Sequence, residues 1–153
     1  QDIHESMWIY SLEDARKELL KSPVGIDTIN AIKNSDVIIN VINMRMHPTG
    51  ARGEQFGDRI DIYARQCQNE LVFSQTIVHE MAHYRFGIEK CQHAEAICFA
   101  MEKMHKERRD YLKPNEWEYV KKLAQDTYPE LKWEEGGYGN YEQFDFVRDN
   151  KSL

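Results

Sequence analysis

The stretch IVHEMAHY, residues 77–84, decides how the rest of this 153-residue chain is interpreted. It contains the pattern His-Glu-x-x-His, and its flanks favour a helix. Residues four apart on a helix share a face, so His79 and His83 can offer two imidazole nitrogens to one metal ion. Glu80 follows the first histidine, where its carboxylate can act as general base on a metal-bound water. The stretch therefore predicts a zinc site with Glu80 as the catalytic residue.

A second helix is predicted for residues 92–107, because apolar residues recur there at helical spacing. Glu95 lies among these apolar positions, where a carboxylate without a partner is unfavourable to bury. A metal ion would supply that partner, so Glu95 is the third ligand we expect, and the fourth position stays open for water. Glu89 and His93 remain the alternative candidates for the third position.

The run EAICFA, residues 95–100, together with the His-Glu-x-x-His pattern, resembles ImmA/IrrE-type and toxin-type zincins. The second helix of those proteins carries a Glu-Ala-x-x-Phe-Ala-like segment. The whole chain is also similar to the metallopeptidase-like domains at the C-terminal end of MuF-type phage minor head proteins. Two features depart from the pattern: Ile97 stands where ImmA/IrrE proteins usually have Asn, and only eleven residues separate His83 from Glu95. The resemblance implies a gluzincin-like metallopeptidase.

The expected fold is α+β and zincin-like, a single domain in which a small mixed sheet packs against helices. Ser11 can cap a first helix that Pro23 ends. Further helices are expected at residues 27–34 and 115–127. The β-branched run 37–42 predicts a buried strand, and the alternation at 59–63 predicts a half-buried one. Residues 44–56 between them are expected to form a solvated loop. By the resemblance, the strand at 59–63 is the candidate sheet edge along which an extended substrate lies.

Composition limits the cellular compartment and the binding partners that we expect. A formal charge of −6 argues against nucleic acid or an anionic membrane as the main partner. The three cysteines, Cys67, Cys91 and Cys98, form no Cys-x-x-Cys pair, which favours a reducing, cytoplasmic compartment over a disulfide framework. A structural Cys/His zinc site is a further alternative. Because the chain begins at Gln1 rather than Met, we expect a piece processed or excised from a longer protein.

The function we expect is a zinc-dependent endopeptidase acting on a protein or peptide substrate. The resemblance adds a phage- or toxin-associated effector that is delivered by a phage or a secretion system. His105, Tyr111, Tyr138 and an arginine are all candidates for the donor that stabilises the oxyanion. The alternatives are a zincin-like module of a phage particle that binds without turnover, and a structural domain in which the histidine pair is incidental.

Overall fold

The computed structural model describes residues 10–86, 91–134 and 145–148. These residues form five α-helices and a three-stranded mixed sheet, which confirms the α+β class. In chain order the elements are α2 (Leu12–Leu19), α3 (Pro23–Lys33), β1 (Ile38–Ile42), β2 (Gly53–Phe56), β3 (Arg59–Tyr63), the 3-10 turn η1 (Ala64–Gln66), α4 (Glu70–Phe86), α5 (Gln92–Glu107) and α6 (Pro114–Thr127).

The first two helices begin at serine caps. The Ser11 hydroxyl accepts a hydrogen bond from the Asp14 N–H at 3.1 Å, as the sequence predicted. The next helix, α3, begins at Pro23 and not near residue 27. Its cap is Ser22, whose hydroxyl accepts from the Gly25 N–H at 2.8 Å, and proline suits the first turn because it lacks an N–H. The proline that was expected only to end one helix therefore starts the next.

The sheet has the order β1-β3-β2, with β1 parallel and β2 antiparallel to β3. The strand predicted at residues 59–63 is confirmed as β3. It is not an edge strand and not half-buried, because β3 is central and both Asp61 and Tyr63 are buried. β1 was expected to be buried, yet it lies at an edge, where the Ile38 side chain is 59% exposed. β2 arises within the predicted loop, because the turn at Gly57 (φ +55°) folds it back onto β3.

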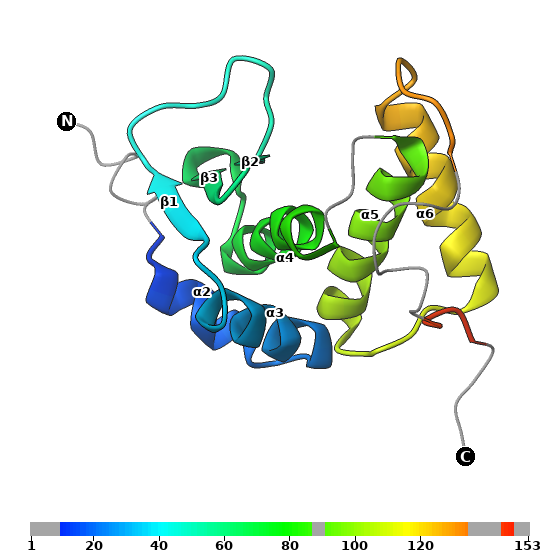
Figure 1. The fold of residues 1–153 in the computed structure, drawn as a ribbon, viewed down its shortest axis with the longest axis horizontal. Helices are drawn as coiled ribbons and strands as arrows, with labels where there is room; N and C mark the ends of the chain where they lie inside the picture. The colour runs from blue at the N-terminus through cyan, green and yellow to red at the C-terminus, as the bar shows by residue number, and fades with distance from the viewer. Residues whose placement is uncertain (1–9, 87–90, 135–144, 149–153) are drawn as a thin grey trace.

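Helix α4 lies at the centre of the molecule (Figure 1). It contacts the helices α2, α3 and α5 and the strands β2 and β3. Helix α6 packs against α5. The α4 side chains Phe73, Ile77 and Met81 are almost fully buried. The helix that carries the His-Glu-x-x-His pattern is therefore also the main core helix of the fold.

A buried histidine joins three of these helices. His105 of α5 lies with Nδ1 2.5 Å from the Ser22 hydroxyl and Nε2 2.9 Å from the Ser74 hydroxyl. Ser74 already donates its proton to the Leu71 carbonyl, so His105 Nε2–H donates to Ser74 and Nδ1 accepts from Ser22. This arrangement suits the neutral ring, and burial lowers the pKa of His105 to about 4.

We expect His105 to make the metal-free protein sensitive to acid. Because the folded state holds the pKa below the unfolded value of about 6.5, the stabilisation is complete above pH 6.5 and is lost as the pH falls towards 4. Urea unfolding at pH 6.5 and pH 5 should show a loss of about 2 kcal/mol from this group. His105→Gln should not lose this stability between pH 6.5 and pH 5. If the free energy of unfolding depended on pH equally in both proteins, the prediction would be wrong.

Candidate metal centre

The two histidines of the motif lie one turn apart on the α4 face that meets α5. Both are buried, with 6% of His79 and 5% of His83 exposed, and their ring centroids are 5.2 Å apart. Helix α5 spans Gln92–Glu107, the bounds expected from the sequence, and places Glu95 against both rings. The spacing within each helix and the packing of one helix on the other therefore bring these three side chains together.

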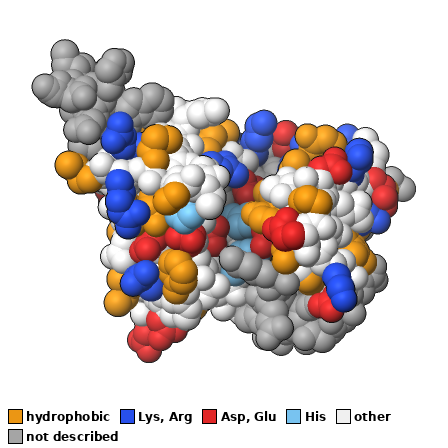
Figure 2. Space-filling model, turned by 90° about the horizontal axis from the view of Figure 1, so that it is seen from above, with side chains coloured by type: hydrophobic (Ala, Val, Ile, Leu, Met, Phe, Trp, Pro, Cys, Tyr) orange, Lys and Arg blue, Asp and Glu red, His pale blue; other side chains and the backbone are white. Residues whose placement is uncertain are grey.

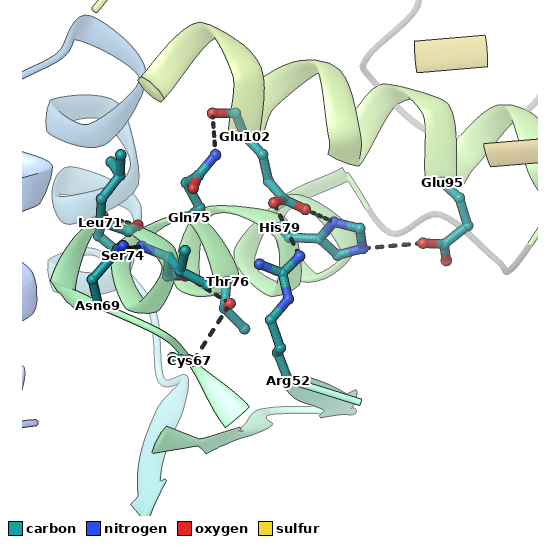
Figure 3. A network of polar contacts seen from close by, with 11 residues as sticks. Arg52, Cys67, Asn69, Leu71, Ser74, Gln75, Thr76, His79, Glu95 and Glu102 are labelled. Carbon is teal, nitrogen blue, oxygen red and sulfur yellow. Dashed lines mark hydrogen bonds and ion pairs between the residues drawn. The ribbon is translucent and has the colours of Figure 1, made fainter. Parts of the chain in front are cut away.

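Glu95 bridges the two imidazoles. Its Oε1 lies 3.0 Å from His79 Nε2, and its Oε2 lies 3.1 Å from His83 Nε2 (the His79 contact is drawn in Figure 3). Ligand atoms at about 2.0–2.1 Å from a tetrahedral zinc ion lie roughly 3.3–3.4 Å from one another. The two observed nitrogen–oxygen separations are within a few tenths of an ångström of that value.

A sulfur atom lies beside the same histidines. One ligand atom each from His79, His83 and Cys98 lie within 4.8 Å of one another, and all three residues are buried. This group could hold a metal ion. Glu95 and Cys98 are three residues apart on α5, so both lie towards α4 on one face of the helix. The two histidines thus have two neighbouring candidates for a further ligand.

Glu102, which the sequence analysis did not single out, orients the first histidine. Its Oε2 lies 2.6 Å from His79 Nδ1, and its Oε1 accepts from Arg52 Nη2 at 3.3 Å (Figure 3). A carboxylate on Nδ1 holds the ring so that Nε2 faces the metal position, as in many metalloproteins. Glu102 follows Glu95 by seven residues, two helical turns on the same face, and that spacing was the signal in the sequence.

The charges of the metal-free site are partly offset by protons. Burial favours neutral His79, but hydrogen bonds to Glu102 and Glu95 raise its pKa well above 6.5. Burial likewise favours neutral Glu95, yet hydrogen bonds from both histidines hold its pKa below 4.5. These contacts favour a His79 ring that carries a proton on each nitrogen and donates to a carboxylate on either side. A bound cation would replace the proton on Nε2.

Glu80 lies at the same centre and is 9% exposed. Burial raises the pKa of its carboxyl group; the nearby histidines lower that pKa, while Glu95 and Glu102 raise it further. Strand β2 passes close above it at Gly53, where a Cβ atom would lie 3.1 Å from Glu80 Cγ and 2.9 Å from Thr76 Cγ2. Gly53 therefore allows the strand to approach the helix at the proposed general base.

Gly53→Ala is expected to destabilise the protein by about 1–3 kcal/mol, because the new methyl group overlaps side chains of α4. Thr76→Ser removes Cγ2 but keeps the hydroxyl that donates to the Val72 carbonyl. The double variant should therefore recover part of the loss, as measured by chemical unfolding of all four proteins. Strictly additive effects would mean that the methyl group does not meet Thr76.

The alternative third ligands are placed differently. His93 lies on α5, but its ring packs on Trp133 with centroids 4.7 Å apart, and its Nδ1 lies 3.2 Å from the Glu134 carbonyl oxygen. Its ring is thus engaged by the segment that follows α6. Glu89 lies outside the described residues. Among the described candidates, Glu95 is the carboxylate that contacts both histidines.

Two of the expected oxyanion donors, His105 and Tyr111, are engaged in other contacts. His105 is engaged by two serines, and the Tyr111 ring packs with Arg109 and Arg148. Tyr138 lies outside the described residues. Tyr128, which the sequence analysis did not name, follows α6 and stacks on Phe99 with ring centroids 6.3 Å apart.

Tyr128 lies close enough to the centre to respond to its charges. Burial raises the pKa of its phenol well above 10, and Glu95 and Glu80 raise it further. Phe99, on which it stacks, also meets the His79 ring edge-on at 5.1 Å. The phenol therefore stays protonated and is a possible hydrogen-bond donor beside the site.

Seen from above, histidine side chains with acidic groups beside them lie in a hollow between the sheet and the α5–α6 half of the molecule (Figure 2). A cavity of about 280 Å³ lies elsewhere, between α2, α3 and β1. Its lining is mainly aliphatic, with Arg16 and Lys33 as the polar members, and it contains none of the metal-centre side chains. This cavity is therefore separate from the group formed by His79, His83, Glu95 and Cys98.

Comparisons with protein-family models, with curated proteins and with solved structures found no match to the chain. Within the described residues, no helix has the length and apolar character needed to cross a membrane. The functional argument therefore depends on the geometry and chemistry of the site itself.

Proposed function

We propose that the protein is a zinc-dependent endopeptidase with a gluzincin-like centre, in which His79, His83 and Glu95 hold the metal and Glu80 is the general base. The observation that carries the proposal is the convergence of both imidazole Nε2 atoms on the Glu95 carboxylate at 3.0 and 3.1 Å. The resemblance of the motif to ImmA/IrrE-type and toxin-type zincins supports the same reading.

Zinc held there would supply Lewis acidity that polarises a peptide carbonyl and activates a coordinated water. Glu80 would accept the proton that the water loses during attack and deliver it to the leaving amine. A raised pKa suits this role, because the carboxyl group must hold the proton between the two steps. Glu102 would keep His79 oriented throughout, since it binds the ring nitrogen that faces away from the metal.

The phenol of Tyr128 is the candidate donor to the oxyanion. It lies within the field of Glu95 and Glu80 and remains protonated, so it can donate a hydrogen bond without competing as a base. This assignment replaces His105, whose two ring nitrogens are both occupied by serines.

The substrate we propose is an extended segment of protein that pairs with β2. This strand is an edge of the described sheet and packs on α4, where a Cβ atom at Gly53 would lie 3.1 Å from Glu80 Cγ. Backbone pairing at such an edge gives affinity with little dependence on sequence. By the resemblance to toxin and phage-head domains, the target is a host or rival protein inside a cell.

A binding or structural module without turnover is the second candidate. It is favoured by Cys98, because a fourth protein ligand would leave no open position, as in structural zinc sites. The experiment that separates the two candidates removes the Glu80 carboxylate while retaining the metal. Loss of cleavage with full metal content supports the peptidase, and unchanged cleavage patterns support the module.

A further inference from the structure

Cys98 has no role in the peptidase chemistry, and its surroundings are unusual for a packing residue. Its side chain is fully buried, and no hydrogen bond to Sγ is described in residues 10–86, 91–134 and 145–148. The sulfur lies within 4.8 Å of ligand atoms of His79 and His83. A cysteine that serves only as a small hydrophobe faces aliphatic neighbours. This one faces two imidazoles.

Carboxylates also lie close to this place. Glu95 contacts both histidines, and Glu102 contacts His79. A divalent ion among them would be attracted by the carboxylates and would stabilise the thiolate directly, because a coordinating thiol is deprotonated by its metal.

A Cys98 ligand would change the number of protein donors at the centre. Glu95 lies 3.0 and 3.1 Å from the two histidine Nε2 atoms, and Cys98 Sγ lies within 4.8 Å of ligand atoms of both histidines. A centre that used all four side chains would have two nitrogen donors, one oxygen donor and one sulfur donor. Four protein ligands complete a tetrahedral zinc site, whereas catalytic sites keep three and leave one position to water. The third ligand and the sulfur come from adjacent turns of α5, so one helix can deliver both.

We propose that Cys98 is a fourth protein ligand of the metal, so that the resting centre is closed and water enters only when the sulfur leaves. Binding breaks the S–H bond, forms a sulfur–metal bond and releases the proton to solvent, with no change of oxidation state. The mixed nitrogen, oxygen and sulfur set suits Zn²⁺ and Co²⁺. The ligation stands on the geometry alone, and the regulatory consequence rests on the proposed peptidase function.

The test is the absorption spectrum of the protein loaded with Co²⁺, which reports a thiolate ligand without any substrate. Wild type is expected to show an intense near-ultraviolet sulfur-to-cobalt charge-transfer band, and Cys98→Ala should lack it. Cys91→Ser is the matched control, because Cys91 is also buried but is the N-cap residue of α5, accepting from the Ala94 N–H at 3.3 Å. It should keep the band.

Zinc affinity and turnover give two further readouts. Competition with a chelator should show zinc bound more weakly by Cys98→Ala than by wild type, at unchanged folding by circular dichroism. In an excess of zinc, the variant should cleave faster than wild type, by about tenfold if the wild-type site is open one-tenth of the time. Cys98→Ser, which keeps a polar side chain, should resemble Cys98→Ala in all readouts.

The outcomes separate this proposal from the peptidase. Cobalt bound through the histidines without the charge-transfer band overturns Cys98 as a ligand and leaves the open peptidase site standing. A band without cleavage by any variant supports the ligand and overturns the peptidase. Slower cleavage by Cys98→Ala despite full zinc overturns the closed resting state. Failure of wild type to bind cobalt or zinc overturns both proposals.

Discussion

Glu80→Gln is expected to lower peptide-bond hydrolysis by roughly 10²–10⁴-fold while zinc content and thermal stability stay nearly unchanged. Glutamine has almost the same shape, but its amide cannot accept the proton that the attacking water loses. Glu80 is not a ligand in the proposed centre, so the metal should remain. The side chain is buried, and the amide fills the same space without leaving a cavity.

The measurement must be broad, because the substrate is identified only as protein. Wild type and Glu80→Gln, each with one zinc per chain, are incubated with a bacterial cell lysate, and new protein N-termini are compared by mass spectrometry. Cleavage sites that appear with wild type and not with the variant support the peptidase. Cys98→Ala and the double variant Cys98→Ala/Glu80→Gln run in parallel keep the comparison decisive if wild type rests in a closed state.

Substitution of a proposed metal ligand is expected to have the second largest effect, which is on zinc content and on the stability of the protein. Native mass spectrometry is expected to find one zinc bound to wild type and none to His79→Ala. The substitution also leaves the Glu95 and Glu102 carboxylates buried without their shared partner, which destabilises the metal-free protein by about 3–5 kcal/mol. An intact wild type that stays metal-free in zinc-supplied preparations would rule out the site.

Glu95→Ala and Glu89→Ala form the matched pair that decides the third ligand. Glu95 contacts both histidines, so its removal should weaken zinc binding strongly, and titration with zinc should show normal binding for Glu89→Ala. The reverse result would assign the third ligand to Glu89.

Local signals predicted the metal helices well. The bounds of α5 match the expected helix, because its apolar periodicity is a property of residues close together in the sequence. The encounter of Glu95 with the two histidines also followed, since a carboxylate at an apolar helix position needs a partner. Glu102 was not predicted, although it follows Glu95 by seven residues and therefore lies on the same face of α5.

Features that depend on contacts between distant parts of the chain could not be predicted from the sequence. Strand β2 has no apolar alternation, and it exists because the turn at Gly57 places it against β3. The strand order that makes β3 central is likewise decided by pairing across the sheet and not by composition. Arg52 reaches Glu102 only because this hairpin lies over α4, so its role could not be inferred from a loop sequence.

The central position of α4 has an evolutionary consequence. In many enzymes the reacting residues stand on loops above a scaffold, and the two can change independently. Here Ile77 and Met81 fill the core from the same helix that presents His79 and His83. A substitution that repacks the interior therefore also moves the two histidines, so this core should tolerate less sequence change between related proteins than the outer helix α6.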